Sequence, residues 1–128
     1  MNMTNEELTS AVEKLQYQVS ILKETINFDD FPVEYLILSK GWSREDLNRA
    51  HDIFEKWDTR LRNGEKMSFS EFERDFSDEL GVNYQGVKSV IRAFYRNGQW
   101  TEVCEAFVDD MGPHPSVEYH FIRDRKRA

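Results

Sequence analysis

The feature that most constrains the fold is a heptad pattern of apolar residues near the start of the chain. Between residues 8 and 26, large aliphatic side chains recur at alternating spacings of four and three, which is the pattern of a coiled-coil seam. Leucines occupy the d positions and β-branched residues the a positions: Leu8, Val12, Leu15, Val19, Leu22 and Ile26. We therefore expect residues 1–27 to form one long helix whose seam is the interface of a homo-oligomer.

The start of this helix is predicted by Thr4 and Glu7, whose spacing is that of a capping box. A stripe of about 20 residues spans roughly 30 Å, which is more than a short neighbouring helix covers, so association with other copies of the chain is expected. The alternative is that the seam packs against later helices of the same chain. Valine at a and leucine at d favour a dimer, whereas the small or uncharged flanking residues permit a wider bundle.

Residues 30–111 are predicted to form shorter helices, and residues 1–111 to form a single helical domain. Ser43, Ser68 and Asn83 are good helix N-caps, and glycines at 41, 64, 81 and 98 are placed to end helices. No strand alternation is convincing. The fold class predicted is all-α, with about five to six helices per subunit and the coiled-coil-like helix at the N-terminus. In the helix over residues 31–40, we expect four apolar side chains to be largely buried: Phe31, Tyr35, Leu36 and Leu38.

Charge divides the chain into an acidic part and a basic end. The net charge is −7, with four basic and two acidic residues after Met111, so the preceding part is near −9. We interpret residues 112–128 as a flexible basic tail, because Gly112, Pro113 and Pro115 break the preceding helix. An acidic body disfavours nucleic acid and anionic membranes.

No apolar run is long enough to span a bilayer, and the lone Cys104 fits a reducing compartment, so we expect a cytoplasmic protein.

Few residues form patterns typical of catalysis or metal binding. His51, Glu55 and Asp58 share one helical face at a spacing that could hold a divalent cation, but such residues also form ordinary solvated surface and no further ligand is evident. Cys104 has acidic and apolar neighbours, which is typical of a small core residue rather than a nucleophile. We therefore predict no cofactor, no bound metal and no enzymatic activity.

Three strings, over residues 30–41, 67–72 and 93–111, match the pattern of a known family. On these strings, the stretch from about Leu15 to Met111 resembles the YhaI-like family of small uncharacterised helical proteins of Bacillus-type bacteria and their phages. The resemblance implies a subunit of about five helices in an intertwined homo-oligomer, with a trimer favoured over the dimer that the heptad pattern favours. These strings contain no catalytic signature.

The hypothesis that follows is a non-enzymatic, self-associating helical protein that binds and regulates or inhibits another protein, with a phage-encoded regulator of a host toxin or defence factor as one version. One alternative is a nucleic-acid-binding accessory protein that uses the basic tail or an oligomer surface, although nucleic acid is an unlikely partner. Another is an enzyme whose site forms between subunits, with groups such as His51 and Asp58. Possible partner contacts are Trp42, Trp100, Arg123, Arg125, Lys126 and Arg127.

Overall fold

The computed structural model describes residues 2–127, and these residues are helical with no strand. Seven α-helices are present, slightly more than the five to six predicted, because the C-terminal segment contributes one. In chain order the elements are α1 (Asn5–Thr25), α2 (Pro32–Lys40), α3 (Arg44–Arg62), α4 (Phe69–Leu80), α5 (Tyr84–Arg96), α6 (Thr101–Asp110), the 3₁₀ turn η1 (Val117–Tyr119), α7 (His120–Arg123) and the 3₁₀ turn η2 (Asp124–Arg127).

Helix starts follow the predicted caps. The Ser43 hydroxyl accepts from the Asp46 amide while the Asp46 carboxylate accepts from the Ser43 amide, so the capping box of α3 is complete. Thr4, Ser68 and Asn83 each accept from the amide three residues later. Local hydrogen bonding at these polar residues therefore decides where the helices begin.

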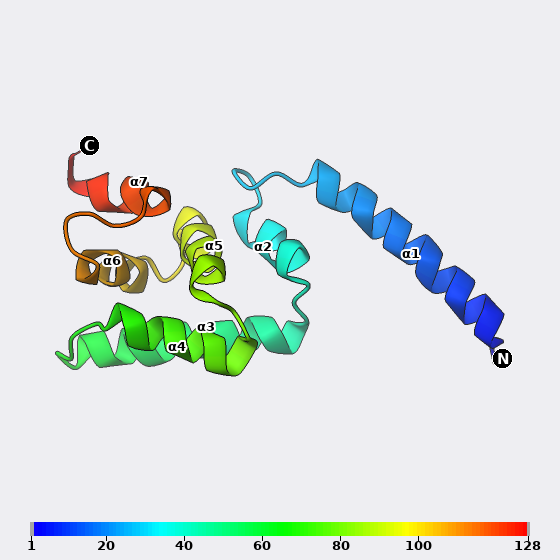
Figure 1. Ribbon diagram of the computed structural model, residues 1–128, viewed down its shortest axis with the longest axis horizontal. Helices are drawn as coiled ribbons and strands as arrows, with labels where there is room; N and C mark the ends of the chain where they lie inside the picture. Colours follow the sequence, from blue (N-terminus) through cyan, green and yellow to red (C-terminus); the bar gives the residue numbers. More distant parts are fainter. Residues whose placement is uncertain (1, 128) are drawn as a thin grey trace.

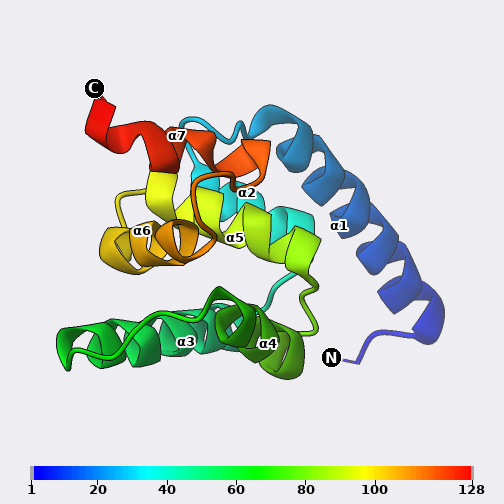
Figure 2. The same ribbon diagram turned by 60° about the vertical axis from the view of Figure 1, so that its left-hand side comes forward.

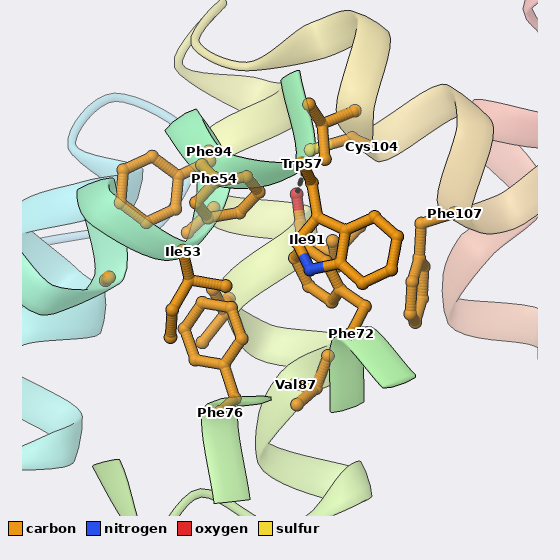
Figure 3. Packing of buried hydrophobic residues seen from close by; sticks show 14 of the residues in the cluster. Ile53, Phe54, Trp57, Phe72, Phe76, Val87, Ile91, Phe94, Cys104 and Phe107 are labelled. Carbon is orange, nitrogen blue, oxygen red and sulfur yellow. Dashed lines mark hydrogen bonds between the residues drawn. The ribbon is translucent and has the colours of Figure 1, made fainter. Parts of the chain in front are cut away.

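Aromatic side chains from three helices form the centre of the core. Figure 3 shows Phe54 of α3, Phe72 and Phe76 of α4, and Phe94 of α5 gathered at one point. Ring centroids lie 5.4 Å apart for Phe54 and Phe72 and 5.0 Å apart for Phe54 and Phe94, within the range of favourable edge and tilted contacts. Phe107 of α6 joins Phe72 at 5.2 Å. These residues are fully buried, so α3 to α6 share one core.

The N-terminal helix stands apart from this core. Figure 1 shows α1 extending away from the other helices, and Figure 2 shows the same separation from another side. Helix α2 packs along α5, and α1 contacts the rest of the molecule mainly through α2. No residue of α1 is buried. We use "body" below for residues 28–125, which include the core and the elements packed on it.

The C-terminal segment differs from the flexible basic tail predicted over residues 112–128. Tyr119 and Ile122 are 1% and 0% exposed, and the Tyr119 ring lies 5.6 Å from that of Phe107. The segment α7 packs against α6. The predicted break after Met111 is present, but two apolar side chains beyond it return to the core. Residues 117–123 are therefore part of the folded body, and this part of the prediction is corrected.

Two further side chains are more exposed than predicted. Leu36 is buried as expected, but Phe31 and Tyr35 are 51% and 42% exposed. Phe31 precedes Pro32 as the N-cap residue of α2, and the Tyr35 ring lies against Phe28 outside the buried core. The short α2 has apolar residues on more than one face, so its periodicity does not distinguish the buried side from the exposed one.

Candidate interaction surface

The apolar seam of α1 is open to solvent in the single chain. We call the side chains of Leu8, Val12, Leu15, Val19 and Leu22 the α1 stripe; their exposed fractions range from 38% for Val19 to 59% for Leu15. Among the described residues, α1 carries seven of the thirteen exposed large apolar side chains. An exposed apolar surface of this extent is typical of an interaction site.

The sequence left open whether this seam packs on later helices of the same chain. In the structure it does not, since α1 has no buried residue and touches the body chiefly at α2. Ile26, the last residue of the predicted seam, behaves differently. It lies one residue past α1, its amide donates to the Leu22 carbonyl, and it is half-buried. Ile26 thus belongs to the junction between α1 and the body.

The two tryptophans suggested as partner contacts pack against the body itself. The Trp100 indole nitrogen donates to His51 Nδ1 at 3.0 Å, and its ring stacks on Phe54 at 5.9 Å. Trp100 also has a positive φ of 53°, which is uncommon for a residue other than glycine. Trp42 is half-buried against the core. Both side chains therefore have an intramolecular role already.

The basic residues near the C-terminus are engaged within the chain where their side chains are described. Arg125 pairs with Asp109 at 2.8 Å and Glu105 at 3.4 Å, and the hydrogen bond that its guanidinium donates to Asp109 raises the pKa of the guanidinium. Arg123 pairs with Asp124 at 2.9 Å. The side chains of Lys126 and Arg127 lie outside the described residues. Two carboxylates of α6 thus pair with Arg125, one of the basic residues suggested as a nucleic-acid contact.

Of the three residues considered for metal binding, His51 and Asp58 have structural partners and Glu55 is exposed. His51 accepts the Trp100 indole proton on Nδ1, and Asp58 pairs with Arg62 at 2.7 Å. No group of three or more His, Cys, Asp or Glu that could hold a metal occurs within residues 2–127. The Cys104 thiol is fully buried, and burial together with the nearby Glu105 carboxylate raises its pKa well above the ordinary value. Its assignment as a small core residue is confirmed.

The sequence did not single out Lys40 and Arg92, two cations that line a pocket between α2 and α5. Both belong to ordinary amphipathic helices, and nothing local marks them. Their surroundings depend on how the loop after α1 folds back on α5, which brings Phe28 over Arg92. That is a long-range contact with no signal in the spacing of either residue.

One known family matches most of the chain. A family model described as "Protein of unknown function (DUF1878)" matches residues 5–111. The chain belongs to this family. The matched range begins with α1 and ends just after α6, so the DUF1878 region includes the α1 stripe but not the segment that returns Tyr119 and Ile122 to the core. No solved structure matches the chain.

The sequence predicts no membrane-spanning segment, and the helices of residues 2–127 bear on this prediction. None of these helices combines the length and the apolar character that crossing a bilayer requires.

Proposed function

We propose that this DUF1878 protein is a non-enzymatic helical protein that self-associates through α1 and, in the assembled form, binds and regulates another protein. The observation that carries the proposal is the α1 stripe, an apolar heptad surface that the rest of its own chain leaves exposed. Burial of a fully exposed Leu or Val side chain contributes about 1.5–3 kcal/mol, so each half-exposed stripe residue would contribute roughly half of that, which favours contact between copies. The resemblance to the YhaI-like family supports a trimer.

The proposal of a non-enzymatic role is supported by the environment of the reactive side chains. Cys104 is buried with a raised pKa, and His51 accepts a hydrogen bond from Trp100. Each is held by the body in a packing role. The regulatory part of the proposal, including a phage-encoded regulator of a host factor, is supported by the family resemblance and by the acidic body.

The alternative of nucleic-acid binding has weaker support. Arg123 and Arg125 are neutralised by carboxylates of the same chain, and the net charge of the whole chain is −7. Phosphate contacts would have to compete with these ion pairs.

Self-association is tested by placing charges in the stripe. Leu15→Asp with Leu22→Asp introduces two carboxylates at the centre of the proposed interface, and their burial would be strongly unfavourable. We expect light scattering coupled to size exclusion to give three times 15.2 kDa for the wild type and the monomer mass for the variant.

The matched control is Ser10→Asp with Tyr17→Asp, which adds the same charge to exposed f positions of α1. This control should keep the wild-type mass. A wild-type protein that is monomeric at tens of micromolar, or a stripe variant with unchanged mass, would refute association through α1.

Partner binding is tested by affinity purification of the tagged chain from nuclease-treated lysate of its native host, followed by mass spectrometry. We expect one protein to co-elute at fixed stoichiometry with the wild type. Recovery of the chain alone would argue against a regulatory role and leave self-association as the remaining part of the proposal.

A further inference from the structure

A second surface of interest is a pocket of about 260 Å³ between α2 and α5. Its apolar walls are the rings of Phe28 and Tyr35, which meet edge to face at 6.2 Å, and the side chain of Leu36. Four polar groups line the rest: Ser39 and Lys40 from α2, and Ser89 and Arg92 from α5. The pocket therefore combines two aromatic rings with two cations and two hydroxyl groups.

Arg92 is the cation of α5 that forms no ion pair with a described residue. Its neighbours on α5, Lys88 and Arg96, pair with Glu118 at 3.6 Å and Asp29 at 3.9 Å. Arg92 forms no such ion pair among the described residues, although the Glu118 carboxylate interacts with it electrostatically, and its Nε is buried without a hydrogen bond. A buried donor without a partner is unfavourable, and more so when the group is charged. The arrangement around Arg92 is therefore incomplete in the chain alone.

The Arg92 side chain is nevertheless held in place. Its guanidinium carbon lies 5.2 Å from the centre of the Phe28 ring, a cation–π contact. The loop that carries Phe28 is fixed by an Asn27–Asp30 turn and by the contacts of Asp29 with Arg96. A cation that is fixed by an aromatic ring and forms no ion pair is preorganised to accept an oxyanion.

Lys40 is the second cation, and it also lies against α5. A Cβ at position 86 would be only 2.8 Å from Lys40 Nζ, so Gly86 leaves space for the ammonium beside the helix. Residues 86, 89 and 92 are three apart and share one side of α5. Lys40 makes no ion pair or hydrogen bond with any residue in the described part of the chain. The two unpaired cations of the pocket thus lie along one side of the same helix.

We propose that this pocket binds a small organic oxyanion that carries a planar apolar group. Arg92 and Lys40 would neutralise a phosphate or carboxylate, with Ser39 and Ser89 as hydrogen-bond donors, since guanidinium groups bind both oxyanions in bidentate geometry. The planar group would lie against Phe28 and Tyr35. None of the lining residues belongs to α1, so this site does not depend on self-association.

The test uses calorimetric titration of the full chain with phenyl phosphate, which joins a ring to a phosphate. Inorganic phosphate and benzyl alcohol serve as the separate halves, and benzoate replaces phosphate by carboxylate. We expect phenyl phosphate to bind at least tenfold more tightly than either half. The ratio between benzoate and phenyl phosphate assigns the preferred oxyanion, and saturable binding of either ligand at this site supports the proposal.

Arg92→Gln should weaken binding of the preferred ligand at least tenfold, and Lys40→Gln several-fold. The matched controls are Arg74→Gln and Lys66→Gln, which remove exposed cations outside the pocket and should leave affinity unchanged. Circular dichroism of each variant verifies that the fold is retained.

Three results would overturn the proposal. The first is absence of saturable binding to both phenyl phosphate and benzoate. The second is an equal loss of affinity in Arg74→Gln and Arg92→Gln, which would indicate nonspecific charge attraction. The third is equal affinity for inorganic phosphate and phenyl phosphate, which would exclude a role for the aromatic wall. If Arg92→Gln does not fold, Phe28→Leu supplies the second variant, and unchanged affinity there would also count against the site.

Discussion

Helix α1 and the body place their apolar residues in opposite environments. The large apolar side chains of α3 to α6 meet inside one chain, with Phe54, Phe72 and Phe107 fully buried. Those of α1 follow an equally regular pattern but are open to solvent, with Leu15 59% exposed. The comparison teaches that periodicity predicts which side of a helix is apolar, whereas only the surrounding chain determines what that side contacts.

The largest loss of stability is expected for a substitution in the core of the body. Phe72→Ala removes a ring that lies within 5.2–6.1 Å of four other aromatic rings. We expect the free energy of unfolding to fall by about 3–5 kcal/mol, since the substitution leaves a cavity as well as losing burial. Urea unfolding measures this. A loss below about 1 kcal/mol would show that the core does not depend on this ring.

The C-terminal segment is tested at Ile122, which is fully buried. Ile122→Ala is expected to lower the free energy of unfolding by about 2–5 kcal/mol. The control Val117→Ala changes a side chain that is 72% exposed and should alter it by less than about 0.5 kcal/mol. If both variants lowered the free energy of unfolding equally and only slightly, residues 112–128 would be a tail that does not stabilise the body.

The same segment should make the protein sensitive to alkali. Burial, with Glu73 and Glu118 nearby, raises the pKa of Tyr119 above its ordinary value of 10.0. Above pH 10 the unfolded chain loses this proton while the folded chain keeps it, so stability falls as pH rises, by up to about 1.4 kcal/mol per pH unit. Calorimetric melting from pH 8 to 11 measures the slope. Tyr119→Phe should reduce it, and an unchanged slope would exclude Tyr119 as the cause.

The smallest effect is expected on α1. Leu15→Ala, measured by urea unfolding in solutions dilute enough for the chain to be monomeric, should change the free energy of unfolding by less than about 0.5 kcal/mol. Leu36→Ala is the matched change at a side chain that is 2% exposed, and it should cost about 2–5 kcal/mol. Similar losses in the two variants would mean that α1 packs on the body in solution.

Much of the fold could be predicted from the sequence because its signals are local. The side chains of Thr4, Ser43, Ser68 and Asn83 act on amides three residues away, so helix starts were predicted correctly. Gly41 and Gly81 end helices in the left-handed conformation that glycine adopts without strain. Each of these features depends on a few neighbouring residues.

The parts that could not be predicted depend on contacts between distant residues. Nothing near Tyr119 or Ile122 distinguishes them as buried, because charged residues such as Glu118 and Arg123 alternate with apolar ones and the chain before them is broken by Gly112 and Pro113. The contact between Phe28 and Arg92 joins a loop to a helix far along the chain. Such contacts require the path of the whole backbone, which spacing within one segment does not contain.

The separation of α1 from the body also has an optical consequence. All three tryptophans lie between residues 42 and 100, while α1 carries a single aromatic residue, Tyr17. Intrinsic tryptophan fluorescence therefore reports on the body alone, whereas far-ultraviolet circular dichroism also includes the 21 residues of α1. In an unlabelled sample, melting of α1 would change the ellipticity without shifting the emission, so the two regions can be observed independently.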